Sequence, residues 1–160
     1  MNKNTNSGFK TVRGYQTANQ QNGQLTSALE DYLEMAFRLC QENEYTRIGI
    51  LSEHLNVRPS SASKMIYKLT VLGYLKYNRY EIIQLTDTGY EVGKYLLKRH
   101  ETIERFLNLL GSPNPLEETE LIEHSLNAST VSNLNILLDF FQTNESIRNS
   151  YNLFKAKKSK

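Results

Sequence analysis

Carboxylate and imidazole side chains recur at helical spacing in the C-terminal half of the sequence. Glu120, Glu123 and His124 stand three and four positions apart, so a helix through them would present all three on one face. Glutamate and histidine are common ligands of divalent metal ions, and three of them on one face would form a chelating surface. The spacing therefore indicates a candidate metal site.

A second pair of carboxylates, Asp31 and Glu34, has the same spacing near the N-terminus, and His100 lies between the two groups in the sequence. Cys40 is the only cysteine, which excludes an internal disulfide and a cysteine-based zinc cluster. Oxygen and nitrogen donors without thiolate favour Mn²⁺ or Fe²⁺ over softer ions, although this donor set does not exclude Zn²⁺.

Each of these side chains also has an ordinary explanation when it is taken singly. Acidic residues on an amphipathic helix are usually solvated, and a lone histidine usually lies on the surface or in a satisfied core position. His54 is interpreted only in this ordinary way. The metal hypothesis therefore depends on the combination of residues.

The 160 residues suffice for one domain or for two small helical modules, and we expect two modules. With 39% hydrophobic and 22% charged residues the composition is typical of a globular protein. We find neither an apolar run long enough to cross a bilayer nor a secretory signal, so the expected location is the cytoplasm and no membrane partner is expected.

Charge is segregated along the chain, although the formal net charge is only +2. Between Val57 and Tyr80 there are five basic residues and no acidic one, whereas between Glu101 and Glu145 the only Lys or Arg is Arg105. A basic segment suits a polyanionic partner, and an acidic segment would repel phosphate. We therefore expect DNA to contact the first segment and not the second.

The pattern over residues 25–88 predicts a winged helix-turn-helix. Apolar periodicity predicts a helix over 25–41, a short helical segment over 46–55 and a second short helix over 59–72, opened by Pro59. Alternating residues at 74–77 and 80–85 predict a β-hairpin, the wing. Two short helices joined by a tight turn, the second of them basic, are typical of a DNA-binding helix-turn-helix.

The remaining pattern is helical. A long helix is predicted over 87–110, followed by helices over 116–126 and 129–141 and a last one around 147–154. The fold class is therefore mainly α, with an N-terminal winged helix-turn-helix, a small β-hairpin wing and an all-helical domain, whose role as a dimerisation domain is implied by the family resemblance given below. The expected divisions are a flexible extension (1–24), the DNA-binding domain (25–88), the metal-binding and dimerisation domain (89–143) and a basic tail (144–160).

Candidate DNA contacts lie at the start of the second short helix, along it and in the wing. A recognition helix reads base edges with its N-terminal residues, and outlying cations meet phosphates. The expected contacts are Arg58, Ser60, Ser61, Ser63, Lys64, Lys68, Lys76 and Arg79.

From about Leu25 to Phe141 the sequence resembles the manganese transport regulators, a branch of the diphtheria toxin repressor family. The resemblance is carried by the segments LEDYLE (29–34), RPSSASKM (58–65), LTDTG (85–89), KRH (98–100) and IEH (122–124). It implies two metal ions per chain, held between the first helix, the connecting helix and the first dimerisation helix. The matching positions are Asp31, Glu34, His100, Glu120, Glu123 and His124, and no catalytic residue is implied.

Iron-responsive members of that family resemble this chain but place methionine where Asp31 stands and cysteine where Glu120 stands. Because both positions here are carboxylates, hard-donor preferences favour Mn²⁺, with Fe²⁺ possible. The SH3-like domain common in iron-responsive members is expected to be absent.

The expected function is that of a manganese-responsive repressor controlling metal-ion homeostasis, with manganese uptake genes as the targets that the resemblance implies. It would be a homodimer on a palindromic operator, and not an enzyme. In this hypothesis the metal links the DNA-binding module to the dimer module. Three alternatives stay open: a ferrous-iron-responsive repressor of the same fold, a winged-helix regulator with an organic effector or none, and a binuclear metallohydrolase.

Overall fold

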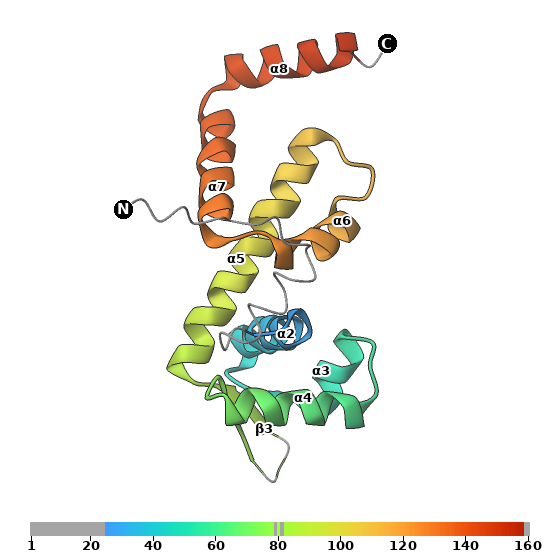
Figure 1. The fold of residues 1–160 in the computed structure, drawn as a ribbon, viewed down its shortest axis with the longest axis vertical. Coiled ribbons are helices and arrows are strands. Elements are labelled where there is room, and N and C mark those ends of the chain that lie inside the picture. Colours follow the sequence, from blue (N-terminus) through green and yellow to red (C-terminus); the bar gives the residue numbers. More distant parts are fainter. Residues whose placement is uncertain (1–24, 79, 81, 159–160) are drawn as a thin grey trace, which may run out of the picture. The chain divides into compact units, whose positions relative to one another are not determined.

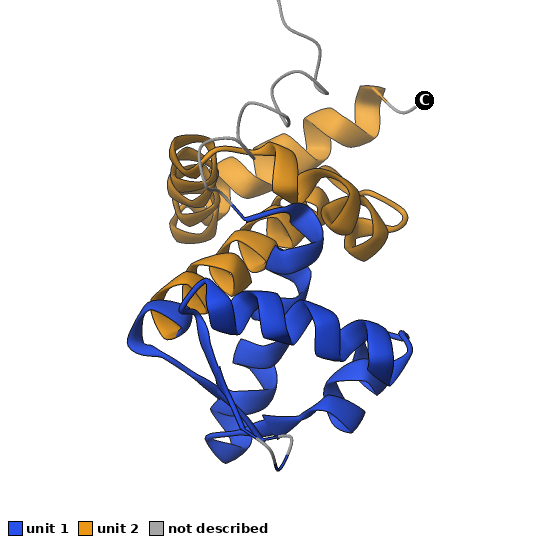
Figure 2. Ribbon diagram, turned by 60° about the horizontal axis from the view of Figure 1, so that its bottom comes forward, with its two compact units in different colours: residues 1–89 blue, residues 90–160 orange. Residues whose placement is uncertain are grey.

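The computed structural model describes residues 25–158 except Arg79 and Glu81. The expected flexible extension, 1–24, therefore lies outside the described residues. The chain divides into two compact units, of which the first ends at Gly89 and the second begins at Tyr90 (Figure 2). Each unit is described by itself below.

In its described residues the first unit combines helices with a small sheet (Figure 1). Its elements are α2 (Ser27–Asn43), β1 (Thr46–Arg47), α3 (Ile48–His54), α4 (Pro59–Val71), β2 (Leu75–Tyr77) and β3 (Ile82–Leu85). The mainly helical fold with an N-terminal winged helix-turn-helix is thus confirmed.

Helix α2 forms the centre of the first unit's core. Thr26 caps it, because its Oγ1 accepts a hydrogen bond from the backbone N of Leu29 at 3.3 Å. Leu33 and Phe37, one turn apart on the same face, are fully buried, as are Ile66 and Leu69 of α4. Burial of each such side chain contributes roughly 1.5–3 kcal/mol, so the packing of α2 on α4 fixes where the recognition helix lies.

The turn between α3 and α4 depends on Asn56, whose φ is 51°. Asparagine tolerates this left-handed conformation better than most residues, so the chain can reverse within four residues before Pro59 opens α4. The expected helical segment over 46–55 is wrong at its start. Thr46 and Arg47 form β1, because the β-branched Thr46 is buried and pairs with Ile83.

The expected hairpin is present, and it belongs to a three-stranded antiparallel sheet of order β1-β3-β2. Strand β2 pairs with β3 in the register Leu75 to Leu85 and Tyr77 to Ile83. The third strand was not anticipated, because a two-residue strand leaves no alternating pattern in the sequence.

All the regular secondary structure in the described part of the second unit is helical. Its elements are the greater part of α5 (Asp87–Leu110), α6 (Pro115–Ile122), the 3₁₀ turn η1 (Glu123–Ser125), α7 (Ala128–Thr143) and α8 (Glu145–Lys158). The expected helix over 116–126 is wrong at its end, where η1 replaces the last turn. Helix α8 extends well beyond the expected 147–154.

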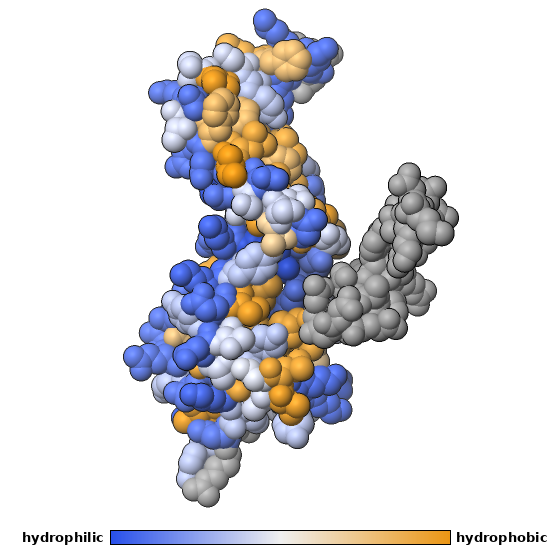
Figure 3. Space-filling view, turned by 60° about the vertical axis from the view of Figure 1, so that its left-hand side comes forward, coloured by the Kyte–Doolittle hydropathy of each residue, from blue (hydrophilic) through white to orange (hydrophobic). Residues whose placement is uncertain are grey.

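Apolar side chains remain exposed on the second unit, and Figure 3 shows them gathered in the upper part of the view, where α7 lies. Ile136 and Phe140 of α7 are 63% and 47% exposed, and Leu153 and Phe154 of α8 are 66% and 61% exposed. An exposed apolar surface of this kind is typical of sites that interact with other molecules. Among the described residues, no helix combines the length and hydropathy needed to span a bilayer.

Gly89, in the first turn of α5, allows a close approach of two backbones. The side chain of Thr86 accepts a hydrogen bond from the backbone N of Gly89 at 3.0 Å and donates one to the carbonyl O of Gly73 at 2.7 Å. A Cβ at position 89 would stand 1.8 Å from the backbone O of Tyr74. Any other residue would therefore force α5 away from the start of β2.

We expect Gly89→Ala to destabilise the protein by about 1–3 kcal/mol, the usual cost of an overpacked position. Urea denaturation followed by circular dichroism measures the change. Gly49→Ala in α3 is the matched control, because nothing lies within 4 Å of a Cβ there. This control should be neutral or stabilising by up to about 1 kcal/mol, and equal losses in both variants would contradict the explanation.

Cys40 lies in the core of the first unit. Its Sγ is 3.7 Å from the carbonyl O of Ile83, and burial raises the pKa of the thiol to about 11. The thiolate is the nucleophilic form. At pH 8 only about one thiol in a thousand is then ionised.

The thiol of Cys40 should therefore react slowly with a disulfide reagent such as DTNB at pH 8, and rapidly once the chain is unfolded in urea. Absorbance of the released thiolate follows both rates. Complete reaction of the folded protein within the mixing time would show that this core is open to solvent.

Candidate metal centre and nucleic-acid interface

Three elements of the second unit bring carboxylates and imidazoles together. His100 comes from α5, Glu120 from α6, and Glu123 and His124 from η1. The Nδ1 atom of His100 is 3.3 Å from Oε2 of Glu123 and 3.7 Å from Oε1 of Glu120. The Nε2 atom of His124 is 3.9 Å from Oε1 of Glu123. These four side chains form one cluster, called the C-terminal cluster below.

The change from α-helix to 3₁₀ turn accompanies a change in how deeply these side chains lie. The side chain of Glu120, on regular helix, is 56% exposed, whereas those of Glu123 and His124 are 2% and 15% exposed. Sequence reasoning placed all three on the face of one helix. The structure brings Glu120 and Glu123 to His100, and His124 to Glu123, but Glu123 in η1 is buried whereas Glu120 in α6 is at the surface.

The C-terminal cluster has the donors that a divalent cation needs. The Oε2 atom of Glu123 is buried and accepts no hydrogen bond from the described part of the chain. A buried carboxylate oxygen without a donor is costly, and a cation would satisfy it. With imidazole nitrogen and carboxylate oxygen nearby, the cluster suits a borderline or hard divalent ion.

Asp31 and Glu34 lie on α2 in the first unit, three positions apart. The Oε1 atom of Glu34 accepts hydrogen bonds from Nε and Nη2 of Arg38 at 3.0 and 2.7 Å. Both bonds go to the same oxygen, so this arginine does not use Oε2 of Glu34. Burial first, and the charge of Asp31 second, raise the pKa of the neighbouring Tyr32.

Arg99 is a residue that sequence reasoning did not single out, although it stands next to His100. Its side chain is 4% exposed, and its Nη2 lies 3.1 Å from Nδ1 of His124. Arginine is rarely buried without anionic or polar partners. Its position within the KRH segment (98–100) was the available signal, but sequence spacing does not show which helix face is buried.

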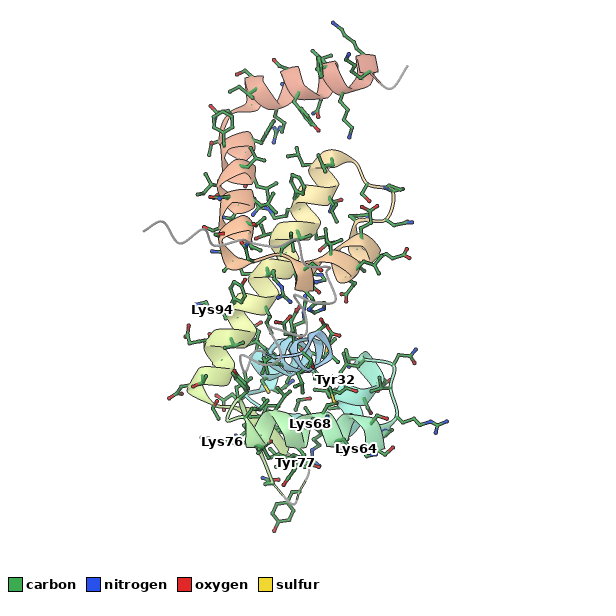
Figure 4. All side chains as sticks on the ribbon, viewed as in Figure 1. Tyr32, Lys64, Lys68, Lys76, Tyr77 and Lys94 are labelled. Atoms are coloured by element: carbon green, nitrogen blue, oxygen red, sulfur yellow. The ribbon has the colours of Figure 1, made fainter. Side chains whose placement is uncertain are left out.

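The expected DNA contacts on α4 occupy its exposed side. Ser60 and Ser61 are exposed in the first turn, and Ser63 is half-buried. Lys64 and Lys68 are exposed further along the helix (Figure 4). An exposed helix side with cations and hydroxyls can enter a major groove.

The other expected contacts flank this helix. Arg58 is the N-cap residue of α4 and is exposed, and Lys76 is exposed on β2. Arg79 lies outside the described residues. Tyr67 is 65% exposed between Lys64 and Lys68. Sequence reasoning missed this tyrosine, although it falls outside the apolar face of the helix, which was the signal for it.

Comparisons with known proteins agree with this architecture. Residues 24–83 match the family described as iron dependent repressor, N-terminal DNA binding domain. Residues 86–150 match the iron dependent repressor, metal binding and dimerisation domain. The first match covers the winged helix-turn-helix, and the second covers the C-terminal cluster.

Two relatives and two solved structures illustrate the similarity. The HTH-type transcriptional regulator MntR of Geobacillus thermodenitrificans is 38% identical over 122 residues, which cover 75% of this chain and 86% of that protein. The HTH-type transcriptional regulator MntR of Bacillus subtilis is 35% identical over 123 residues, which cover 76% of this chain and 87% of that protein.

The metal-dependent transcriptional regulator MtsR superposes with a TM-score of 0.64 at 27% identity, over 72% of this chain and 55% of that one. The manganese regulator SloR superposes with a TM-score of 0.62 at 27% identity, over 70% of this chain and 54% of that one. The chain thus spans about half the length of these solved structures.

A winged helix-turn-helix followed by a helical unit with a buried carboxylate and imidazole cluster defines a metal-dependent transcriptional regulator. The chain belongs to the iron-dependent, or diphtheria toxin, repressor family, with regulators named MntR among its relatives.

Proposed function

We propose that this protein is a manganese-responsive DNA-binding repressor that controls metal-ion homeostasis in the cytoplasm, with manganese uptake genes as its targets. The observation that carries the proposal is the C-terminal cluster, in which the buried Oε2 of Glu123 accepts no hydrogen bond from the described residues and lies 3.3 Å from the imidazole of His100. The matched domains are those of transcriptional repressors, which are not enzymes, so the proposal includes no catalytic step.

The proposed metal ligands are the six residues at which the sequence matches the family pattern, and they bind two ions per chain. They are Asp31, Glu34, His100, Glu120, Glu123 and His124. Support comes from the C-terminal cluster itself and from the oxygen of Glu34 that Arg38 leaves unused. An ion that takes ligands from both units would favour arrangements in which the two DNA-binding heads of a dimer fit the operator.

Manganese is favoured over softer ions because the proposed site has only oxygen and nitrogen donors. The one thiol of the sequence, Cys40, lies in the core of the first unit near Ile83, with its pKa raised to about 11. It is therefore unsuited to be a thiolate ligand. Relatives named MntR and the manganese regulator SloR support the same choice.

DNA recognition is proposed to use the exposed side of α4 in a major groove, with two copies of the protein on a palindromic operator. Ser60, Ser61, Ser63 and Lys64 would reach base edges, while Arg58, Lys68, Lys76 and Arg79 would meet phosphates. The exposed apolar side chains of α7 and α8 support self-association as the second partner surface.

Titration of the metal-free protein with Mn²⁺, followed by loss of the free-ion signal in electron paramagnetic resonance, tests the metal site. We expect about two ions per chain, as the binuclear family pattern implies, with binding lost in the Glu120→Ala/Glu123→Ala variant because the cluster then lacks both of its carboxylates. Fe²⁺ titrated anaerobically in parallel tests the choice of metal.

The matched control is Glu101→Ala/Glu117→Ala, which removes two exposed carboxylates of the same unit that are not in the cluster. It should bind as the unaltered protein does. Absence of tight Mn²⁺ uptake by the unaltered protein would contradict the proposed function, and equal loss in both double variants would contradict the assigned ligands.

Binding of a mixed-sequence DNA duplex should weaken steeply with salt, because lysine contacts with phosphate release counterions. Lys68→Ala should reduce the slope of log K against log salt by about one for the lost phosphate contact. Fluorescence anisotropy of the DNA in Mn²⁺-containing buffer, repeated at several salt concentrations, measures this slope. The control is Lys157→Ala, an exposed position of α8 in the other unit, which should leave the slope unchanged. If Lys68→Ala gave the same slope as the unaltered protein, Lys68 would not contact DNA phosphate.

A further inference from the structure

Arg99 places a permanent positive charge inside the second unit, at the edge of the C-terminal cluster. Its Nε lies 4.0 Å from Oε2 of Glu123 and its Nη2 lies 3.1 Å from Nδ1 of His124. The side chains of Arg99 and Glu123 are 4% and 2% exposed. Because a guanidinium does not lose its proton in proteins, this charge stays in place at any physiological pH.

The contact between Arg99 and His124 fixes the state of the imidazole. All nitrogens of a guanidinium donate and none accepts, so Nδ1 of His124 must be the acceptor. A neutral imidazole carries one proton, and with Nδ1 accepting, that proton is on Nε2. In the structure, therefore, one ring nitrogen of His124 is engaged by Arg99 and the other bears hydrogen.

His124 cannot accept this hydrogen bond and ligate a metal ion at the same time. Ligation through Nδ1 uses the same lone pair that Arg99 occupies. Ligation through Nε2 requires the proton to move from Nε2 to Nδ1, which would then face the N–H of Arg99. Both routes break the contact between Arg99 and His124, whichever nitrogen is the ligand.

We propose that Arg99 acts as an internal cation of the metal-free protein and competes with the divalent metal for His124, thereby setting the metal concentration at which the regulator responds. The inference rests on the proposed function, since it takes His124 as a ligand. Arg99 is a positioning residue: it neutralises buried Glu123 when no ion is bound, and its charge opposes an incoming cation.

The second unit also offers Arg99 a place to move. Arg99 lines a cavity of about 170 Å³ between α5 and α7, together with Tyr95, Thr102, Ser132 and Asn135. These neighbours carry hydroxyl and amide oxygens, which can accept hydrogen bonds from the guanidinium. Release of His124 therefore leaves Arg99 with polar partners in the same unit.

Removal of Arg99 should tighten metal binding, because both the competing hydrogen bond and the opposing charge are lost. In the Mn²⁺ titration, Arg99→Met should lower the dissociation constant roughly tenfold, as expected for one charge-assisted hydrogen bond. Lys94→Met is the matched control, since it removes an exposed charge of the same helix that does not line this cavity; it should change the constant less than twofold. An unchanged or higher constant for Arg99→Met would overturn the proposal.

Arg99→Lys covers the case in which Arg99→Met does not fold. It keeps the charge but loses the planar donor group, so it should tighten binding in the same direction by a smaller factor. In the background of His124→Ala, Arg99→Met should lose most of its effect, and a full effect there would show that His124 is not the residue in competition.

Nitrogen-15 NMR of the imidazoles in the metal-free protein gives a readout that does not depend on metal. His124 should carry its proton on Nε2, and a proton on Nδ1 would overturn the proposal. Failure of the unaltered protein to bind Mn²⁺ would reject the proposed function itself. Normal binding by the unaltered protein with no tightening in the Arg99 variants would reject only the role of Arg99.

Discussion

The buried charge of Glu123 is the constraint on which the second unit depends. A carboxylate that is 2% exposed must be compensated, because its transfer from water to the interior is far more costly than a neutral side chain's. His100 and Arg99, adjacent residues of α5, both approach its Oε2. The long helix, the 3₁₀ turn and the cluster are therefore joined by electrostatics as well as by apolar packing.

The first unit is stabilised mainly by apolar packing. Its core is apolar, and the packing of α2 against α4 holds the exposed face of α4 at a fixed angle to the sheet. The backbone contact at Gly89 ties the start of α5 to the end of α4 and the start of β2.

Much of the architecture could be predicted from the sequence. Helical periodicity with Pro59 and the basic, acid-free segment around it indicated the helix-turn-helix, since these are local features. Other features escaped prediction for physical reasons. The strand β1 is only two residues long, and it forms because Thr46 pairs with Ile83, which is distant in the sequence. The start of α7 has a local signal, since Asn127 caps it. No local sequence signal predicted that α6 would end at Ile122 and be followed by η1.

The sequence by itself determined the chemistry: which residues are carboxylates and imidazoles, that the single thiol cannot form a thiolate cluster, and which helix carries the cations. Tertiary structure alone decided which of these groups are buried and which meet. Glu120 and Glu123 look alike in sequence, yet one is at the surface and the other is enclosed. The contact of Arg99 with His124, 25 positions apart, depends on where two helices pack, and long-range packing leaves no periodic trace in either segment.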